Sequence, residues 1–160
     1  MLQLVIVILF ASGSSTVVEK KQLLCRSDDL EILYSSCDHS TKNFSFRVEP
    51  CSLKFENKPR WKGFFFWIPR NDITTVFGSV TLWLANRKVL EWTTNLCSGM
   101  DDGYSFCGAL KGETINTTVN ISGDRIDNQV GEYTAIFKAF ASPTSKKLLF
   151  CMNYTLIKKK

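Results

Sequence analysis

The stretch TINTTVNI, residues 114–121, decides the fold class, because the character of its side chains changes at every second residue. Ile115, Val119 and Ile121 share one face of an extended chain with Thr117, and polar side chains occupy the opposite face. Successive side chains of a β-strand point to opposite faces of a sheet, so this alternation predicts a strand with one buried face.

The same alternation, or a short apolar run, recurs along the chain at a spacing of about ten residues, as in sandwiches and barrels. The further strands that we expect lie at 30–34, 43–49, 64–68, 76–85, 89–93, 133–140 and 148–156. Turn-forming residues such as Asn57-Lys58-Pro59 and Gly123-Asp124 separate them. The pattern predicts an all-β protein, either an antiparallel sandwich or a barrel, and of these we expect an immunoglobulin-like β-sandwich of two antiparallel sheets.

A true immunoglobulin domain fits this sequence poorly. Such a domain has a Trp shortly after its first core Cys and a Tyr two residues before its second. Here the first Trp after Cys37 is Trp61, and Tyr104 lies three residues before Cys107. We therefore expect the sandwich architecture without the immunoglobulin core.

The beginning of the chain indicates its compartment. Residues 1–10 read MLQLVIVILF without a charged side chain, and small residues follow from Ala11 to Ser15. This run is shorter than the roughly 20 apolar residues that cross a bilayer, but it suits a secretory signal peptide. We predict a signal peptide over residues 1–16, a single domain over 17–160, and a secreted, extracellular protein without membrane insertion. A buried N-terminal strand is the alternative.

Cysteines and glycosylation sequons agree with secretion. The six cysteines are even in number and form no C-x-x-C pair, which favours disulfides over zinc, although spacing alone does not choose the pairing. The asparagines of four N-x-S/T sequons are Asn43, Asn116, Asn120 and Asn153. All four fall on the polar phase of their segments, as a solvent-facing glycan requires.

Composition and charge argue against several other functions. The net charge is +5, but residues 158–160 are three lysines, which leaves +2 for the remainder and no basic face for nucleic acid. The single histidine, His39, lies near Cys37, but in a secreted chain we expect that cysteine to be paired. Asp101 and Asp102 lack the spacing of a calcium loop. We therefore expect no enzyme, no metal site and no cofactor.

The 12 Phe, 4 Trp and 4 Tyr residues leave two interpretations of the apolar strand faces. They either fill a closed core or line an apolar ligand cavity between sheets that stand apart. Periodicity cannot separate these interpretations, because core and cavity walls share the same face pattern.

One segment and several shorter motifs carry a family resemblance. The segment reads DGYSFCGALKGETINTT over residues 102–118, and the motifs are YSSCD (34–38), VEPC (48–51), IPR (68–70), GEY (131–133) and LFC (149–151). Together they closely resemble the lipid-recognition (ML-domain) family, in particular its lipopolysaccharide-binding co-receptors of Toll-like receptors. LEILY (30–34) and FRVE (46–49) are also similar to a sister group that partners a Toll-like-related receptor.

The resemblance implies a fold and a function. The fold is a β-cup, whose two antiparallel sheets splay on one side and enclose acyl chains in an apolar cavity. The implied function is a secreted innate-immunity co-receptor that encloses lipopolysaccharide or a related lipid and docks on the Toll-like receptor 4 ectodomain at the cell surface. A soluble lipid carrier, or a regulator of a Toll-like-related receptor, is the alternative. The disulfides implied by position are Cys25–Cys51, Cys37–Cys151 and Cys97–Cys107.

The resemblance also implies site residues. Positions that match the acyl-chain pocket are Ile32, Phe46, Val48, Phe65, Val80, Leu82, Leu84, Phe106, Ile115, Val119, Ile121, Tyr133, Phe137, Phe150, Met152 and Leu156. Positions that match receptor contacts are Arg70, Asp101, Asp102, Tyr104, Ser105, Lys111 and Glu113.

The cavity mouth departs from the family pattern, in which basic residues meet lipid phosphates. The matching positions here are Trp92, Thr93, Asp124, Asp127 and Asn128, with Arg87, Lys88 and Arg125 as partial replacements. Burial of acyl chains does not require these charges, but phosphate pairing does. We therefore expect a lipid-binding co-receptor whose mouth is nearly neutral.

Overall fold

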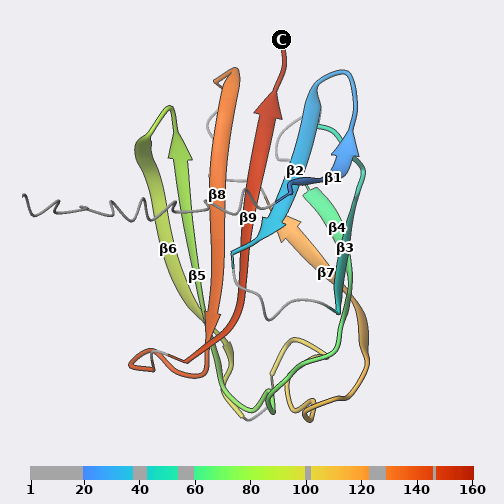
Figure 1. The fold of residues 1–160 in the computed structure, drawn as a ribbon, viewed down its shortest axis with the longest axis vertical. Helices are drawn as coiled ribbons and strands as arrows, with labels where there is room; N and C mark the ends of the chain where they lie inside the picture. Colours follow the sequence, from blue (N-terminus) through green and yellow to red (C-terminus); the bar gives the residue numbers. More distant parts are fainter. Residues whose placement is uncertain (1–19, 38–42, 54–59, 100–101, 123–128, 146) are drawn as a thin grey trace, which may run out of the picture.

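Nine β-strands make up the regular secondary structure of the described residues in the computed structural model (Figure 1). The structure describes residues 20–37, 43–53, 60–99, 102–122, 129–145 and 147–160. The strands are β1 (Gln22–Arg26), β2 (Leu30–Ser36), β3 (Phe44–Glu49), β4 (Arg60–Trp67), β5 (Val76–Leu84), β6 (Arg87–Cys97), β7 (Ile115–Ser122), β8 (Gly131–Phe140) and β9 (Leu148–Lys158). Within these ranges, no helix has the length and hydrophobicity that crossing a bilayer requires.

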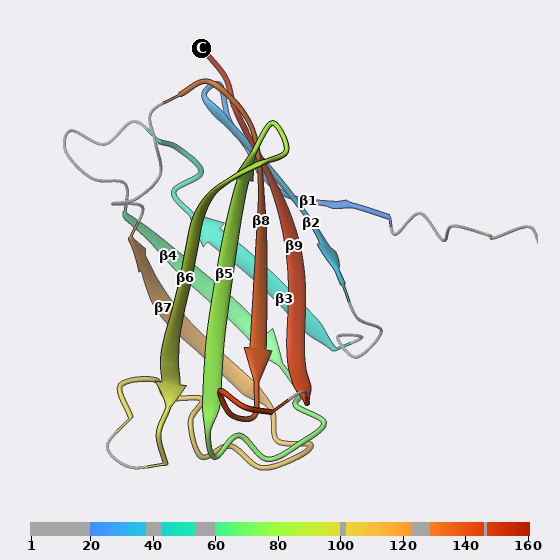
Figure 2. The ribbon, with the colours of Figure 1, turned by 90° about the vertical axis from the view of Figure 1, so that its left-hand side faces the viewer.

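The strands form two antiparallel sheets that face each other. The larger sheet has the order β1-β2-β9-β8-β5-β6, and the smaller has the order β3-β4-β7. Figure 2 looks onto the larger sheet, with the strands of the smaller sheet running obliquely behind it. This architecture confirms the predicted all-β sandwich of two antiparallel sheets.

Strand pairing preserves the alternation seen in the sequence. The central strand β9 lies between β2 and β8, where Tyr154 is paired with Tyr34 on one side and Ala135 on the other. On β7, Val119 and Ile121 face the interior, and Asn120 between them is exposed. The apolar phase of the opening stretch therefore forms part of the space between the sheets.

Four residues without a cross-strand partner interrupt the pairing of the described strands: Leu24, Val89, Leu96 and Leu149. An extra residue in one strand disrupts the hydrogen-bond ladder locally and changes the direction in which the neighbouring side chains point. Leu24, Leu96 and Leu149 turn toward the interior between the sheets, whereas Val89 is exposed. Alternation with period two therefore does not identify these three leucines.

The two sheets are joined along one side, here called the closed seam, and stand apart along the other, the open side. Among the described strands, β1 and β3 are the only pair from different sheets with Cα atoms within 8 Å. The Cys25–Cys51 disulfide crosses the same seam. On the open side, Figure 1 shows the edge strands β6 and β7 on opposite sides of the interior, joined in the chain by residues 98–114.

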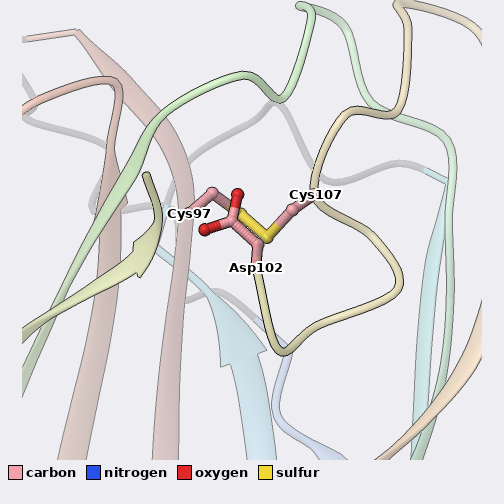
Figure 3. A group of neighbouring side chains, drawn as sticks. All are labelled: Cys97, Asp102 and Cys107. Atoms are coloured by element: carbon pink, nitrogen blue, oxygen red, sulfur yellow. A yellow bond between two sulfur atoms is a disulfide. The ribbon is translucent and has the colours of Figure 1, made fainter. Parts of the chain in front are cut away.

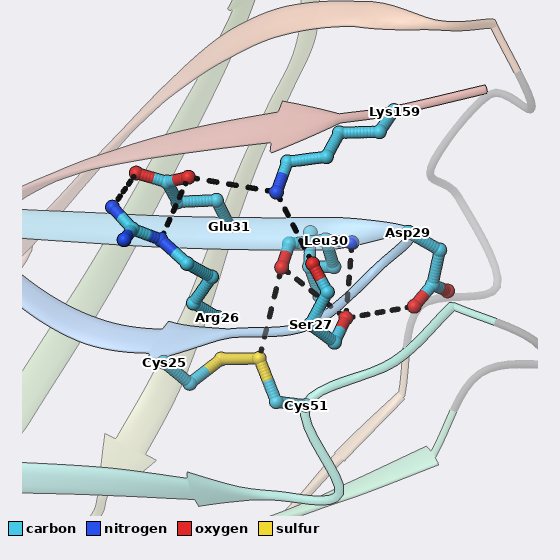
Figure 4. Close-up of polar contacts among 8 residues, drawn as sticks. All are labelled: Cys25, Arg26, Ser27, Asp29, Leu30, Glu31, Cys51 and Lys159. Atoms are coloured by element: carbon cyan, nitrogen blue, oxygen red, sulfur yellow. Dashed lines mark hydrogen bonds and ion pairs between the residues drawn. A yellow bond between two sulfur atoms is a disulfide. The ribbon is translucent and has the colours of Figure 1, made fainter.

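A polar cluster stabilises the closed seam. The carboxylate of the buried Asp29 accepts hydrogen bonds from Ser27 Oγ at 2.8 Å, Ser52 Oγ at 3.0 Å and the Leu53 backbone N–H at 2.7 Å. Burial alone would raise the pKa of Asp29, but these hydrogen bonds outweigh it and lower the pKa to about 2. Figure 4 shows Asp29 and Ser27 close to the disulfide of the seam.

The end of the chain is fixed at the same place. Lys159 Nζ donates to the Ser27 carbonyl at 3.1 Å and lies 3.6 Å from Glu31 Oε2, and Arg26 also pairs with Glu31 (Figure 4). The lysine is thereby engaged at the closed seam and is remote from the open side.

The three disulfides implied by the resemblance are all present. Cys37–Cys151 links the end of β2 to β9 across 114 residues, and Cys97–Cys107 closes a short loop after β6. No cysteine of the protein is left unpaired.

Several predicted elements have different bounds in the structure. β1 was not expected, because its sequence QLLCR does not alternate, and β6 extends well beyond the predicted 89–93. Phe77 and Trp83 of β5 are half-buried on the outer face of the larger sheet, so the apolar residues of this strand do not all share one face. The predicted signal peptide lies outside the described residues, and the predicted domain start at residue 17 lies there as well.

Candidate functional site

A cavity of about 710 Å³ lies between the two sheets. The larger sheet contributes side chains such as Val80 and Phe137, and the smaller sheet contributes Phe46 and Phe65. All the described residues that line the cavity are uncharged, and almost all are aliphatic or aromatic. The cavity interpretation of the apolar faces, rather than a completely filled core, therefore holds for this protein.

The cavity reaches solvent on the open side. Trp92 of β6 and Tyr104 of the 98–114 connection line it while their side chains remain 41% and 40% exposed. Because β6 and β7 are the edge strands of their sheets, a ligand can enter here without breaking strand pairing.

Most of the predicted acyl-chain positions lie on one continuous wall. Those that line the cavity are Ile32, Phe46, Val48, Phe65, Val80, Phe106, Val119, Ile121, Phe137, Phe150 and Leu156. They come from both sheets and from the 98–114 connection. Their contact with lipid stays a prediction.

The remaining predicted acyl-chain positions lie away from the cavity lining. Leu82, Ile115 and Met152 are buried in packed core, Tyr133 is buried, and Leu84 is half-buried. Alternation identifies the inward face of a strand, but it does not show where along that strand the facing sheet moves away. Residues of the packed core and residues of the cavity wall therefore occur on the same inward face of a strand.

Other lining residues were not among the predicted positions. Phe44 and Tyr154 fall on the apolar phases of their strands, so the alternation alone could have identified them as lining residues. Trp61 lies on the part of β4 that precedes the predicted 64–68, whereas Trp67 lies within that segment on the same phase as Phe65. Leu24, Leu96 and Leu149 lie where the strand pairing is irregular, so the alternation of the sequence could not identify them.

Aromatic rings fill the part of the cavity nearest the 98–114 connection. The Phe150 ring packs edge-to-face against Phe44, Trp67 and Phe137, with ring centroids 4.7, 5.7 and 5.8 Å apart. Such pairs typically contribute about 0.5–1.5 kcal/mol beyond the area that they bury. These rings come from both sheets, so their packing holds the two sheets together at this part of the cavity.

The predicted mouth residues are only partly brought to the cavity. Trp92 lines it, whereas Arg87 and Lys88 follow the β5–β6 turn and lie outside the lining. Lys88 Nζ is 2.6 Å from Glu91 Oε2, so its charge is paired on the strand itself. Thr93 is exposed on β6. The mouth positions Asp124, Arg125, Asp127 and Asn128 lie outside the described residues.

Two connections carry the predicted receptor positions at one end of the cup. Arg70, Tyr104, Ser105, Lys111 and Glu113 are all exposed there, and Asp101 lies outside the described residues. The backbone of one connection is bonded to the other, because the Lys111 N–H donates to Asp72 Oδ1 at 2.8 Å and the Gly112 N–H donates to the Pro69 carbonyl at 2.9 Å. The structure thus brings these positions onto one surface.

Asp102 has a structural role within this surface. Its carboxylate accepts hydrogen bonds from the Ser98 N–H and hydroxyl, both at 2.7 Å, and from the Gly99 N–H at 3.1 Å. The bonds from Ser98 and Gly99 lower the pKa of Asp102 against a smaller opposing effect of burial. Figure 3 shows this carboxylate beside Cys97 and Cys107, but the two sulfur atoms are bonded to each other and are not free to ligate a metal.

Solved structures with this fold define its class. Chicken MD-1, solved in complex with lipid IVa, has a TM-score of 0.74 to this chain, with 23% identity over 89% of this chain and 99% of that one. A Niemann-Pick type C2 protein from Japanese carpenter ant has a TM-score of 0.55, with 13% identity over 76% of this chain and 96% of that one. No protein-family model matches the chain. The splayed pair of antiparallel sheets around an apolar cavity is a β-cup, the fold that this chain shares with both solved proteins.

Curated relatives narrow this class to one family. The chain is 37% identical over 145 residues to lymphocyte antigen 96 of Cricetulus griseus, covering 89% of this chain and 87% of that protein. It is 34% identical over 149 residues to human lymphocyte antigen 96, covering 91% and 89%. The chain belongs to the lymphocyte antigen 96 family. Lymphocyte antigen 86 of Mus musculus is less similar, at 28% over 136 residues. These values confirm the resemblance read from the sequence motifs.

Proposed function

We propose that this protein is a secreted, non-enzymatic co-receptor that encloses the acyl chains of lipopolysaccharide or a related lipid and associates with the Toll-like receptor 4 ectodomain. The observation that carries the proposal is the apolar cavity of about 710 Å³, open on one side, in a chain of the lymphocyte antigen 96 family. The lipid IVa bound to chicken MD-1 shows that a protein of this fold accepts an acylated ligand.

The chemistry of the lining favours acyl chains over polar ligands. Each buried methylene contributes about 0.8 kcal/mol, so an apolar wall of this size binds hydrocarbon without any charged contact. The described lining offers no charged side chain to pair with a phosphate or a sugar acid. Binding is therefore expected to depend mainly on chain length.

The lipid-binding part of the proposal is tested on protein purified from secretory cells. Native mass spectrometry of the full chain should show co-purified lipid, and delipidated protein should take up acylated lipid A. Protein that carries no lipid and takes up none would overturn the proposal. The co-purified molecule, once identified, also defines the natural ligand.

The receptor part needs variants that leave the cavity intact. Arg70 and Lys111 are exposed on neighbouring connections and do not line the cavity, so charge reversal at both should abolish capture by the Toll-like receptor 4 ectodomain while lipid uptake is unchanged. Tyr104 and Asp102 are less suitable, because Tyr104 also lines the cavity and Asp102 holds the loop. Lipid uptake without receptor capture by the unmodified protein would favour a soluble lipid carrier.

A further inference from the structure

Tyr154 places a polar group within the apolar cavity. It lies at the middle of β9 and lines the cavity, and its ring packs against both hydrophobic clusters of the interior. One cluster surrounds Met152 and Phe150, and the other surrounds Ile32 and Val48. The side chain therefore lies where the two clusters meet, away from both ends of the cup.

The hydroxyl of Tyr154 lacks the partner that comparable tyrosines have. Tyr34 donates to Gln22 Oε1 at 2.8 Å, and Tyr133 donates to the Gln129 carbonyl at 2.9 Å. Within the described part of the chain, no group forms a hydrogen bond with the Tyr154 hydroxyl. Most buried hydroxyl groups in proteins have at least one partner, so this one requires an explanation.

The hydroxyl is accessible from the cavity. Asn153 Oδ1 is the one buried side-chain oxygen or nitrogen among the described residues that is both sealed and without a partner. The Tyr154 oxygen also lacks a partner among these residues but is not sealed, so it keeps some accessible surface. Because the Tyr154 side chain lines the cavity, the cavity is the side from which we expect a ligand to approach this oxygen.

The surroundings keep the group neutral and able to donate. The Phe46 ring lies edge-on to the Tyr154 ring at 6.2 Å, and Ala135 is its neighbour on β8. Burial raises the pKa of Tyr154, and the adjacent Tyr34 adds to the rise. A protonated phenol is both a donor and an acceptor, but none of the described residues pairs with this one.

We infer that the Tyr154 hydroxyl is a hydrogen-bonding subsite for an oxygen atom carried on the buried part of the lipid, namely a hydroxyl group on an acyl chain or the carbonyl of an acyl ester. This inference rests on the proposed function, and it adds a specificity-determining residue to a cavity that otherwise selects only for hydrocarbon. A site built to hydrogen-bond a ligand oxygen disfavours the analogue that lacks it, because the site group is then left unpaired.

Three fatty-acid probes test the inference on delipidated full-length protein. Tetradecanoic acid has no oxygen on its chain, 3-hydroxytetradecanoic acid has a hydroxyl, and 3-acetoxytetradecanoic acid has an ester but no second long chain. Dissociation constants are measured by calorimetry for the unmodified protein and for Tyr154→Phe. Comparison of the second and third probes distinguishes a hydroxyl partner from an ester partner.

The unmodified protein should bind at least one oxygenated probe about three- to tenfold more tightly than the plain chain, as one net hydrogen bond provides. Tyr154→Phe should lose this preference, so that its dissociation constants for the plain chain and for the oxygenated chains become alike. Tyr34→Phe is the matched control, since its hydroxyl already has a partner, and it should keep the preference.

The outcomes separate this inference from the proposed function. Binding of all three probes without a preference for oxygen, or a preference that survives in Tyr154→Phe, overturns the subsite alone. Failure to bind any probe overturns the subsite and the lipid-binding function together. Thermal unfolding of the empty variant checks that the fold is intact, and removal of an unpartnered oxygen should leave the melting temperature unchanged or slightly raised.

Discussion

The Asp29 carboxylate accepts a hydrogen bond of 2.7 Å from the backbone N–H of Leu53, 24 residues further along the chain. This contact joins the turn between β1 and β2 to the segment that follows β3, and so it joins the two sheets. It lies on the same side as the Cys25–Cys51 disulfide. The closed seam is thus held by a covalent bond and by a buried carboxylate with three donors.

Removal of this carboxylate should destabilise the protein. Asp29→Ala leaves the Leu53 N–H and two hydroxyl groups without their acceptor, which should lower the free energy of unfolding by about 1–3 kcal/mol. Urea denaturation at neutral pH measures the change. Asp28→Ala is the matched control, because the Asp28 side chain is exposed, and an equal loss there would contradict the role given to Asp29.

The same contact gives a pH dependence with a defined sign. The pKa of Asp29 in the folded protein is about 2, below its ordinary value of 3.8. A carboxylate with a lowered pKa stabilises the fold above its ordinary value and loses this contribution as the pH falls toward the folded value. The stability difference between unmodified protein and Asp29→Ala should therefore be constant above about pH 5 and shrink between pH 4 and about pH 2. A difference that grows on acidification would contradict this assignment.

Partial filling of the cavity should weaken lipid binding without unfolding the protein. Ala135→Phe directs a ring from β8 into the cavity, and displacement of only two methylenes, at about 0.8 kcal/mol each, lowers affinity roughly tenfold. Tetradecanoic acid titrations measure the loss. Thr134→Phe places the same ring on the opposite face of β8 and should bind as before, so weakened binding by both variants would count against the cavity as the site.

The disulfides should differ in their contribution to stability. Cys37–Cys151 spans 114 residues and Cys97–Cys107 spans 10. Because a longer closed loop restricts the unfolded chain more, replacement of the first pair by serine should cost about 2 kcal/mol more than replacement of the second. Paired denaturation curves measure this difference, and equal losses would show that native-state effects dominate.

Occupancy of the four sequons should be uneven. Asn43, Asn116 and Asn120 are exposed, whereas Asn153 is half-buried in the central strand of the larger sheet, with its Oδ1 sealed from solvent. A glycan requires room at the side-chain amide, so we expect modification at the first three and none at Asn153. Glycopeptide mapping of the secreted protein tests this. A glycan found on Asn153 of folded protein would require the local packing to differ.

Regular alternation made much of the fold predictable. The phases of residues 114–121 and 148–156 correctly indicated the faces that meet between the sheets, because a buried sheet face forces period two on the sequence. The disulfide pairing came from the family resemblance and could not come from spacing. β1 was missed because a short edge strand needs no clear pattern when its neighbour supplies the pairing.

The cavity wall was less predictable than the fold. Leu24, Leu96 and Leu149 face the interior because an extra residue in the strand shifts the local phase, and such a shift depends on the partner strand. Conversely, Met152 and Leu82 share the phase of wall residues but are covered by packing. The distance between facing sheets sets this distinction, and no single strand encodes that distance.

The closed seam has a mechanical consequence. Where two layers are joined along one side, a change in their separation is smallest at that side and largest at the opposite side. In this protein the fixed side contains the Cys25–Cys51 disulfide, and the edge strands of the open side, β6 and β7, belong to different sheets and do not pair with each other. Lipids of different bulk would therefore be accommodated by separation of the sheets on the open side, while the disulfide of the closed seam stays in place.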